Sequence, residues 1–268
     1  MNKIRLCLAQ VGAQLNSIHL NMKRVLHSIE HANKVSADYV IFPEMYLTGV
    51  CNEQNPSIKL FLEISAEEIK VIQSKARENH VGVILGFLEK ENNHFYNSAV
   101  VIDKKGVIKG KYQKIHLSGL ERNIFSSGSS CNVIRLPEAT IGLMISYDIE
   151  FPEIARILAT NGAQIIITLS AKKYLNHHFR DIYLTSRAME NHVFISCVNL
   201  VGLNNQTVYL GESIVIEPSG DLLYRGSNNE ELPVIELDLS KIKKAGSALD
   251  YMKNRRPKIY EKENIYQL

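Results

Sequence analysis

The sequence predicts a single mixed α/β domain, and three observations carry that prediction. Segments with helical periodicity and segments with strand periodicity alternate along the chain. Its 268 residues contain no linker, internal repeat or low-complexity stretch that would divide them. The strands expected after residue 190 follow one another without helices between them, which argues against a simple doubly wound parallel sheet. We therefore expect one α/β domain over residues 1–268.

The amino-terminal part is expected to begin with a strand and a helix. Residues 4–9 form a short apolar run typical of a buried strand. Apolar side chains then recur from Ile18 to Ala32 at intervals of three and four residues, which is the pattern of an amphipathic helix. The run YVIF at 39–42 indicates a second buried strand. The sequence SAEE at 65–68 predicts that the next helix begins with a capping box, in which serine and glutamate satisfy free backbone amides.

The alternation continues through the rest of the chain. Pro152 and Gly162 are expected to begin and end a helix, since proline favours the first helical position and glycine the position after the last. Residues 177–190 are expected to form another helix. Apolar runs bounded by turn-forming residues predict the remaining strands. These strands are expected at residues 81–88, 97–103, 107–112, 140–146, 164–170, 193–200, 212–218 and 233–239.

Composition restricts the classes of function. No stretch reaches the roughly 18 continuous apolar residues that cross a bilayer, and the amino end lacks the features of a secretory signal. The formal net charge of +3 is small and no basic block stands out, so neither a nucleic acid nor a membrane is an expected partner. The four cysteines show no CxxC spacing, which fits a reducing cytoplasm, where we expect the protein to be located.

Several common catalytic signatures are absent from the sequence. There is no GxSxG elbow, Walker A loop or GxGxxG, so an α/β-hydrolase and a nucleotide-binding protein are disfavoured. No HExxH or paired CxxC indicates a metal site. His177 and His178 are adjacent on an expected helix and point about 100° apart, so we expect pocket or surface residues and not a chelate. The sequence implies no metal and no organic cofactor.

Reactive side chains stand at the ends of three expected strands. Glu44 lies in FPEMYLTG, Lys114 in KYQKIHLSGLER with Glu121 seven residues later, and Ser146 in ISYDIEFPEIAR. Taken alone, each has an ordinary explanation as a solvated turn carboxylate, a surface lysine or a small residue in a tight turn. Strand ends form a rigid platform whose loops shape a pocket. The joint occurrence of these segments in this order therefore favours one common site.

These segments resemble the nitrilase superfamily of carbon–nitrogen hydrolases along nearly the whole chain. The resemblance implies a four-layer α-β-β-α sandwich in a single domain. The run SYDIEFPE is similar to the amidase branch, whereas true nitrilases more often carry tryptophan and glutamate after the nucleophile. The three main motif regions are residues 42–49, 111–128 and 142–156, and further similarity lies at 96–103, 187–194 and 211–220.

The resemblance also implies roles for individual residues. Glu44 and Lys114 match the glutamate and lysine of the family's glutamate–lysine–cysteine set, and Glu121 matches a second glutamate that helps to position the substrate. An amide is a poor electrophile, so its hydrolysis benefits from a covalent acyl intermediate. Glu44 would act as the base, while Lys114 and a backbone N–H near Tyr147 would stabilise the oxyanion. The expected partners are a small amide substrate and further copies of this chain, in a homodimer or larger homo-oligomer.

Position 146 departs from the family pattern, because serine stands where the family has cysteine. A serine hydroxyl is far less acidic than a thiol, and a lone carboxylate is a poor base for it. Three interpretations stay open: an engineered cysteine-to-serine change, a natural pseudoenzyme kept for binding, and a natural serine nucleophile. Retention of Glu44, Lys114 and Glu121 favours the first. We therefore expect the chain as given to hydrolyse amides poorly or not at all, and its parent to be an active amidase.

The loop that follows the expected strand 164–170 should border the pocket. A cation there, Lys172 or Lys173, could pair with a substrate carboxylate, as an ω-amidase or a carbamoyl-amino-acid hydrolase would need. A solvated loop charge is the more common fate of such a lysine. A nitrile-hydrolysing enzyme and the glutaminase portion of an amide-dependent synthetase also stay open. The synthetase is disfavoured because this chain has no residues left for a synthetase domain.

Overall fold

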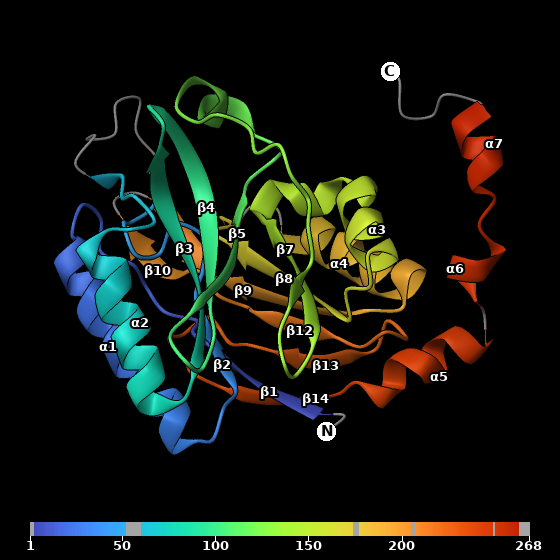
Figure 1. Ribbon diagram of the computed structural model, residues 1–268, viewed down its shortest axis with the longest axis horizontal. Helices are drawn as coiled ribbons and strands as arrows, with labels where there is room; N and C mark the ends of the chain where they lie inside the picture. Colours follow the sequence, from blue (N-terminus) through green and yellow to red (C-terminus); the bar gives the residue numbers. More distant parts are fainter. Residues whose placement is uncertain (1–2, 52–59, 174–176, 205–206, 249, 263–268) are drawn as a thin grey trace.

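The computed structural model describes residues 3–51, 60–173, 177–204, 207–248 and 250–262. Two six-stranded sheets lie face to face, and helices cover the outer face of each sheet (Figure 1). The first sheet has the strand order β14 (Val234–Asp238), β1 (Lys3–Leu8), β2 (Tyr39–Ile41), β3 (Gly82–Glu91), β4 (His94–Ile102) and β5 (Ile108–Gln113). The second has the order β13 (Leu222–Arg225), β12 (Ile214–Ile216), β9 (Phe194–Asn199), β8 (Ile165–Ser170), β7 (Thr140–Ile145) and β6 (Ile134–Arg135).

The helices form the two outer layers. Helices α1 (Ile18–Lys34) and α2 (Glu67–Asn79) cover the first sheet, and α3 (Pro152–Thr160) and α4 (His177–Asn191) cover the second (Figure 1). A separate hairpin joins β10 (Val201–Asn204) to β11 (Thr207–Leu210). The chain closes with α5 (Ser240–Ala248), α6 (Tyr251–Asn254) and α7 (Pro257–Lys262).

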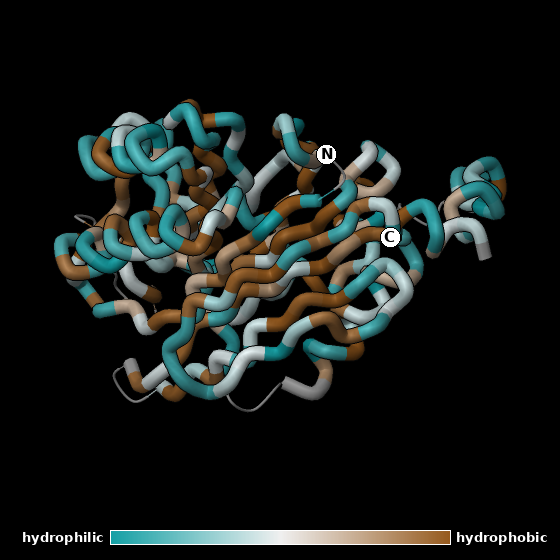
Figure 2. Tube along the Cα trace, turned by 90° about the horizontal axis from the view of Figure 1, so that it is seen from below, coloured by the Kyte–Doolittle hydropathy of each residue, from teal (hydrophilic) through white to brown (hydrophobic). Residues whose placement is uncertain are grey.

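Three apolar cores separate these layers. Leu6 and Ile84 of the first sheet and Ile167 of the second belong to the core between the sheets. Neighbouring residues of the same strands face the helices, as Val83 does below α1 and α2 and Ile166 below α3 and α4. Central strands covered on both faces are apolar along most of their length, as Figure 2 shows. The predicted α-β-β-α sandwich is confirmed.

Each sheet combines parallel central strands with antiparallel edges. In the first sheet β1, β2 and β3 are parallel, and in the second β7, β8 and β9 are parallel. The strands that flank these parallel strands, such as β14 and β12, are antiparallel to their neighbours. The expectation that the sheet is not simply doubly wound is therefore confirmed.

The helix beginning predicted from SAEE is wrong. Helix α2 begins at Glu67, its N-cap is Ala66, and no side chain caps it. The Ser65 hydroxyl donates instead to the Glu63 carboxylate at 3.5 Å. Because Ser65 precedes the N-cap residue, it cannot form the reciprocal bonds of a capping box. The expected boundaries of the next helix are confirmed, since α3 begins at Pro152 and Gly162 follows it with φ of +93°.

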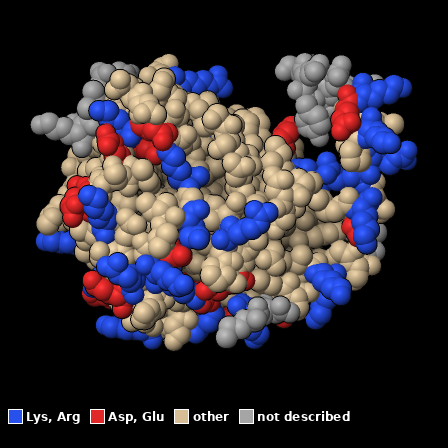
Figure 3. All heavy atoms as spheres, viewed as in Figure 1, with Lys and Arg blue, Asp and Glu red and all other residues tan. Residues whose placement is uncertain are grey.

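Beyond the sheets, α5, α6 and α7 extend away from the sandwich (Figure 1). Lysine and arginine side chains gather on this segment, whereas both signs of charge are mixed over the rest of the face seen in Figure 3. Within the described residues, no helix is long and apolar enough to cross a membrane. His177 and His178 begin α4, but their side chains lie outside the described part of the chain.

Candidate active site

The strand-end segments meet at a pocket of about 350 Å³. Glu44 follows β2 and Lys114 follows β5 in the first sheet, whereas Ser146 follows β7 in the second. The pocket therefore takes its walls from both sheets. The residues singled out in the sequence all line it: Glu44, Lys114, Glu121, Ser146, Tyr147, Lys172 and Lys173.

Lys114 lies between two carboxylates. Its Nζ donates to Glu44 Oε1 at 2.9 Å and to Glu121 Oε1 at 2.6 Å, and its side chain is only 3% exposed. Burial opposes the charged form, but the neighbouring carboxylates of Glu44 and Glu121 outweigh it and raise the pKa of Lys114 above its usual value. The pocket therefore contains an ammonium group that two carboxylates hold in place.

Glu44 accepts hydrogen bonds on both carboxylate oxygens. Besides Lys114, Oε1 accepts from Asn97 Nδ2 at 2.8 Å, and Oε2 accepts from the backbone N–H of Ala171 at 3.0 Å. Asn97 belongs to β4 and lies within a stretch that resembles the family, but it was not among the site residues predicted from the sequence. Its only sequence signal was a polar residue inside an apolar strand.

Glu121 is oriented by a short 3-10 helix, η2 (Gly119–Asn123). Its Oε2 accepts from the backbone N–H of Ser118 at 2.9 Å and from the Ser118 hydroxyl at 3.0 Å. This capping box leaves Oε1 for the contact with Lys114. The serine-x-x-glutamate pattern thus fixes one carboxylate of the pocket.

Ser146 stands at a sharp junction between β7 and the 3-10 helix η3 (Ser146–Glu150). Its φ is +45°, in the left-handed region that side chains other than glycine rarely adopt. The residue is only 8% exposed and lines the pocket. Strained backbone of this kind clusters at functional sites, where the surrounding structure holds it in place.

Asp148 holds this junction against the segment that carries Lys114. Its Oδ2 accepts from the backbone N–H of Ile145 at 3.0 Å and from the Tyr112 hydroxyl at 2.8 Å, while Oδ1 accepts from the backbone N–H of His116 at 2.9 Å. Burial and the Asp148 charge raise the pKa of Tyr112 well above its usual value. Asp148, which ties the two sheets together beside the pocket, was not among the site residues predicted from the sequence.

Three aromatic rings pack against one another next to the turn at Ser146. The Tyr147 ring meets Phe151 edge to face with centroids 5.0 Å apart, and Phe151 stacks on His116 at 3.6 Å. Such packing fixes the direction of the chain after Ser146. Tyr147 lines the pocket, and its expected contribution to oxyanion stabilisation stays a prediction.

The loop after β8 borders the pocket as predicted. The Nζ of Lys172 pairs with Glu150 Oε1 at 2.9 Å, and its side chain is 17% exposed, so it is not a solvated loop charge. Lys173 is exposed and forms a β-bridge with Tyr209. Tyr174, the next residue along the chain, lies outside the described residues.

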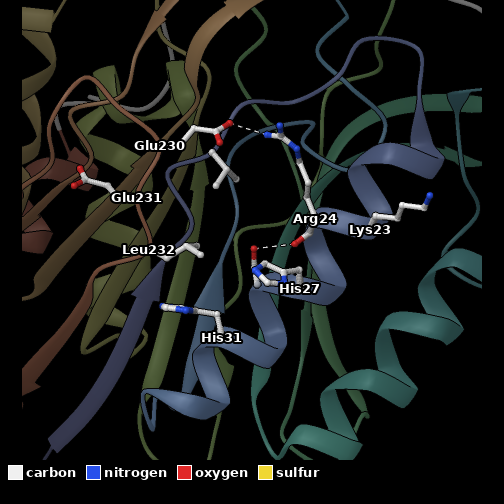
Figure 4. A pocket seen from close by; sticks show the side chains of 9 residues that line it. Lys23, Arg24, His27, His31, Glu230, Glu231 and Leu232 are labelled. Atoms are coloured by element: carbon white, nitrogen blue, oxygen red, sulfur yellow. Dashed lines mark hydrogen bonds and ion pairs between the residues drawn. The ribbon is translucent and has the colours of Figure 1, made fainter.

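A second pocket, of about 610 Å³, lies between α1 and the segment before β14 (Figure 4). Its two carboxylates already have partners, since Glu230 pairs with Arg24 at 2.6 Å and Glu231 accepts from Gln10 at 3.0 Å. The pocket contains none of the strand-end residues. Over the described ranges of the chain, no three histidine, cysteine, aspartate or glutamate side chains are grouped to hold a metal ion. The smaller pocket is therefore the candidate active site.

Comparison with known proteins gives relatives along nearly the whole chain. A carbon–nitrogen hydrolase family model matches residues 5–246. The chain is 31% identical to an (R)-stereoselective amidase from a Pseudomonas species, over 93% of this chain and 90% of that protein. It is 30% identical to a nitrilase from Pyrococcus abyssi, over 96% of this chain and 99% of the relative. A solved carbon–nitrogen hydrolase from Helicobacter pylori G27 has the same fold, with a TM-score of 0.91, 24% identity and 98% of both chains covered.

Proposed function

Because this chain belongs to the carbon–nitrogen hydrolase family, in its amidase branch, we propose that its site is built to hydrolyse a small carboxamide to an acid and ammonia. One observation carries the proposal. The buried Lys114 ammonium lies between Glu44 and Glu121 in a pocket that Ser146 also lines. A base, a positive charge and a strained nucleophile position are the parts that acyl transfer from an amide needs.

The reaction follows from these groups when residue 146 is a cysteine. The thiol sulfur bonds to the amide carbon, and its proton passes to Glu44. Negative charge then develops on the carbonyl oxygen, and the Lys114 ammonium stabilises it. The C–N bond breaks as Glu44 returns the proton to the leaving amine. Water attacks the thioester, Glu44 takes a proton from that water, and the acid leaves as the thiol regains a proton.

With serine at position 146, the chain lacks the thiol that this mechanism needs. We propose that the serine is an engineered replacement for cysteine, because Glu44, Lys114 and Glu121 keep a complete hydrogen-bonded arrangement around the pocket. A natural pseudoenzyme would not require that arrangement, and a natural serine nucleophile would require a stronger base than one carboxylate. The residue at position 146 in the gene separates the engineered interpretation from the other two.

An ammonia-release screen tests the proposal. The chain as given and its Ser146→Cys variant would be incubated with simple aliphatic amides, ω-amides, carbamoyl compounds and nitriles. We expect Ser146→Cys to release ammonia from at least one small amide, several powers of ten faster than the serine form. The amidase proposal fails if the variant releases ammonia from no compound and its thiol is no more reactive toward iodoacetamide than a free thiol. The binding-protein interpretation would then replace it.

We also propose that the chain forms a homodimer or a larger homo-oligomer. The outer face of α3 and α4 supports this, because Ile157, Ile182 and Met189 are exposed there. Exposed apolar patches on a helical layer favour association with a second surface. Sedimentation equilibrium would give a mass at least twice that of the monomer, and a monomer at micromolar concentration would contradict the proposal.

A further inference from the structure

The hydrogen bonds of Glu44 distinguish its two oxygens. A carboxylate has about four acceptor positions, two on each oxygen. Lys114 and Asn97 occupy both positions of Oε1, at 2.9 and 2.8 Å. The backbone N–H of Ala171 occupies one position of Oε2 at 3.0 Å. Within the described part of the chain, the remaining acceptor position of Glu44 is therefore on Oε2.

The backbone N–H that donates to Oε2 lies in a loop, whose position depends on contacts with other elements. Ala171 and Lys172, here called the 171–172 segment, follow the last residue of β8 and belong to no helix or strand. Asn199, the last residue of β9, lies beside them and is fully buried. Its Oδ1 accepts from the backbone N–H of Lys172 at 2.8 Å.

The amide nitrogen of Asn199 is held by hydrogen bonds as well. Its Nδ2 donates to the backbone carbonyl of Gly211 at 2.9 Å and lies 3.4 Å from the carbonyl of Lys172. Since a backbone N–H lies on one side and a backbone carbonyl on the other, only one orientation of the amide satisfies both. A side chain locked in this way can hold the neighbouring backbone to within a few tenths of an ångström.

We propose that Asn199 is a positioning residue for the general base, holding the 171–172 segment so that the Ala171 N–H orients Glu44 with Oε2 as its proton-accepting oxygen. This inference rests on the proposed role of Glu44. The Lys172 side chain adds a second anchor, because it pairs with Glu150 in the same 3-10 helix that begins at Ser146. The 171–172 segment thus connects the base on the first sheet to the nucleophile position on the second.

Loss of Asn199 should alter proton transfer more than substrate binding. Without its anchor, the Ala171 N–H no longer donates to Oε2, and the carboxylate loses a donor that stabilises its charged form. The acid limb of the pH–rate profile then moves to higher pH. Misplacement of the base should lower kcat by about 10²-fold with little change in KM, because small shifts of a reacting group have effects of that size.

The experiment compares Asn199→Ala with Ser213→Ala, each in the Ser146→Cys background. The Ser213 hydroxyl accepts the backbone N–H of Asn199 at 3.0 Å, so its loss also removes a buried hydrogen bond from Asn199 but leaves the side-chain contacts with the 171–172 segment. Two pH profiles would be recorded for each protein: amide turnover, and alkylation of the introduced thiol by iodoacetamide. Alkylation needs no amide substrate, and peptide mapping assigns it to position 146.

We expect Asn199→Ala to move the acid limb of both profiles to higher pH, and Ser213→Ala to lower thermal stability without moving either. The inference is overturned if the acid limbs of both pH profiles stay in place in Asn199→Ala and its turnover and alkylation rates equal those of Ser213→Ala. If Asn199→Ala does not fold, Lys172→Met decides, because it removes the Glu150 anchor at a half-buried position and should move the limbs in the same direction. A Ser146→Cys thiol that alkylates readily without amide turnover would contradict only the proposed substrate.

Discussion

The two sides of the pocket are held by different kinds of contact. On the first-sheet side, charged side chains hold one another, since Lys114 lies between Glu44 and Glu121. On the second-sheet side, buried polar side chains hold backbone groups. Asp148 accepts from the N–H of Ile145, and Asn199 from that of Lys172. In the proposed mechanism, the charged side supplies the chemistry, and the second side places the nucleophile and orients the base.

The largest loss is expected on the charged side. In the Ser146→Cys background, Lys114→Ala removes the cation that stabilises the oxyanion and should lower kcat by about 10²–10³-fold. Steady-state kinetics of amide hydrolysis would measure this fall in kcat. Lys104→Ala is a matched control, because Lys104 also pairs with carboxylates, Asp38 at 2.5 Å among them, but does not line the pocket. Near-normal kinetics in Lys114→Ala would remove the lysine from the mechanism.

On the second-sheet side, Asp148→Ala should mainly lower the stability of the fold. It leaves the Tyr112 hydroxyl and the N–H groups of Ile145 and His116 without their acceptor. Each buried unsatisfied group costs about 1–3 kcal/mol, so the free energy of unfolding should fall by about 3 kcal/mol or more. Urea unfolding gives this value. Asp148→Asn keeps one acceptor oxygen, so its free energy of unfolding should fall less. Equal falls in both variants would contradict the role of Asp148 as the acceptor for these groups.

Glu121→Gln should have a smaller effect, because the amide keeps one acceptor oxygen, which can serve Ser118 or Lys114 but not both. We expect amide turnover in the Ser146→Cys background to fall by about tenfold, the size of one weakened hydrogen bond to a charged group. The thiol should still react with iodoacetamide, since Glu44 remains as the base. Unchanged turnover would show that Glu121 does not position the substrate.

The smallest effect concerns the two lysines of the loop after β8. Lys172 is neutralised by Glu150, so Lys173 is the better candidate to pair with a substrate carboxylate. We expect Lys173→Met to raise KM a few-fold for amides that bear a carboxylate and to leave neutral amides unaffected. Equal changes for both substrate types would make Lys173 an ordinary surface charge.

The same contrast explains what the sequence could predict. Glu44 and Ser146 follow apolar strands, which periodicity locates, whereas Lys114 follows the more polar strand β5. The α-β-β-α layers were expected only from the family resemblance. Asp148 and Asn199 gave no separate signal, because their partners are backbone groups brought together by tertiary structure. Strands of two to four residues, such as β6 and β13, are too short to show periodicity, and α5 to α7 were not anticipated.

The most direct test of the account is whether an acyl group forms at position 146 when that residue is cysteine. The Ser146→Cys variant would be mixed with an amide that it hydrolyses, quenched with acid during turnover, then digested and examined by mass spectrometry. Because the thiol sulfur bonds to the amide carbon before water attacks, we predict a thioester on the peptide that contains position 146, and none when Glu44 is also replaced by glutamine, which cannot take the thiol proton. Cys51 also lines the pocket and serves as an internal reference. An adduct on Cys51 alone, or a modified serine in the chain as given, would contradict the account.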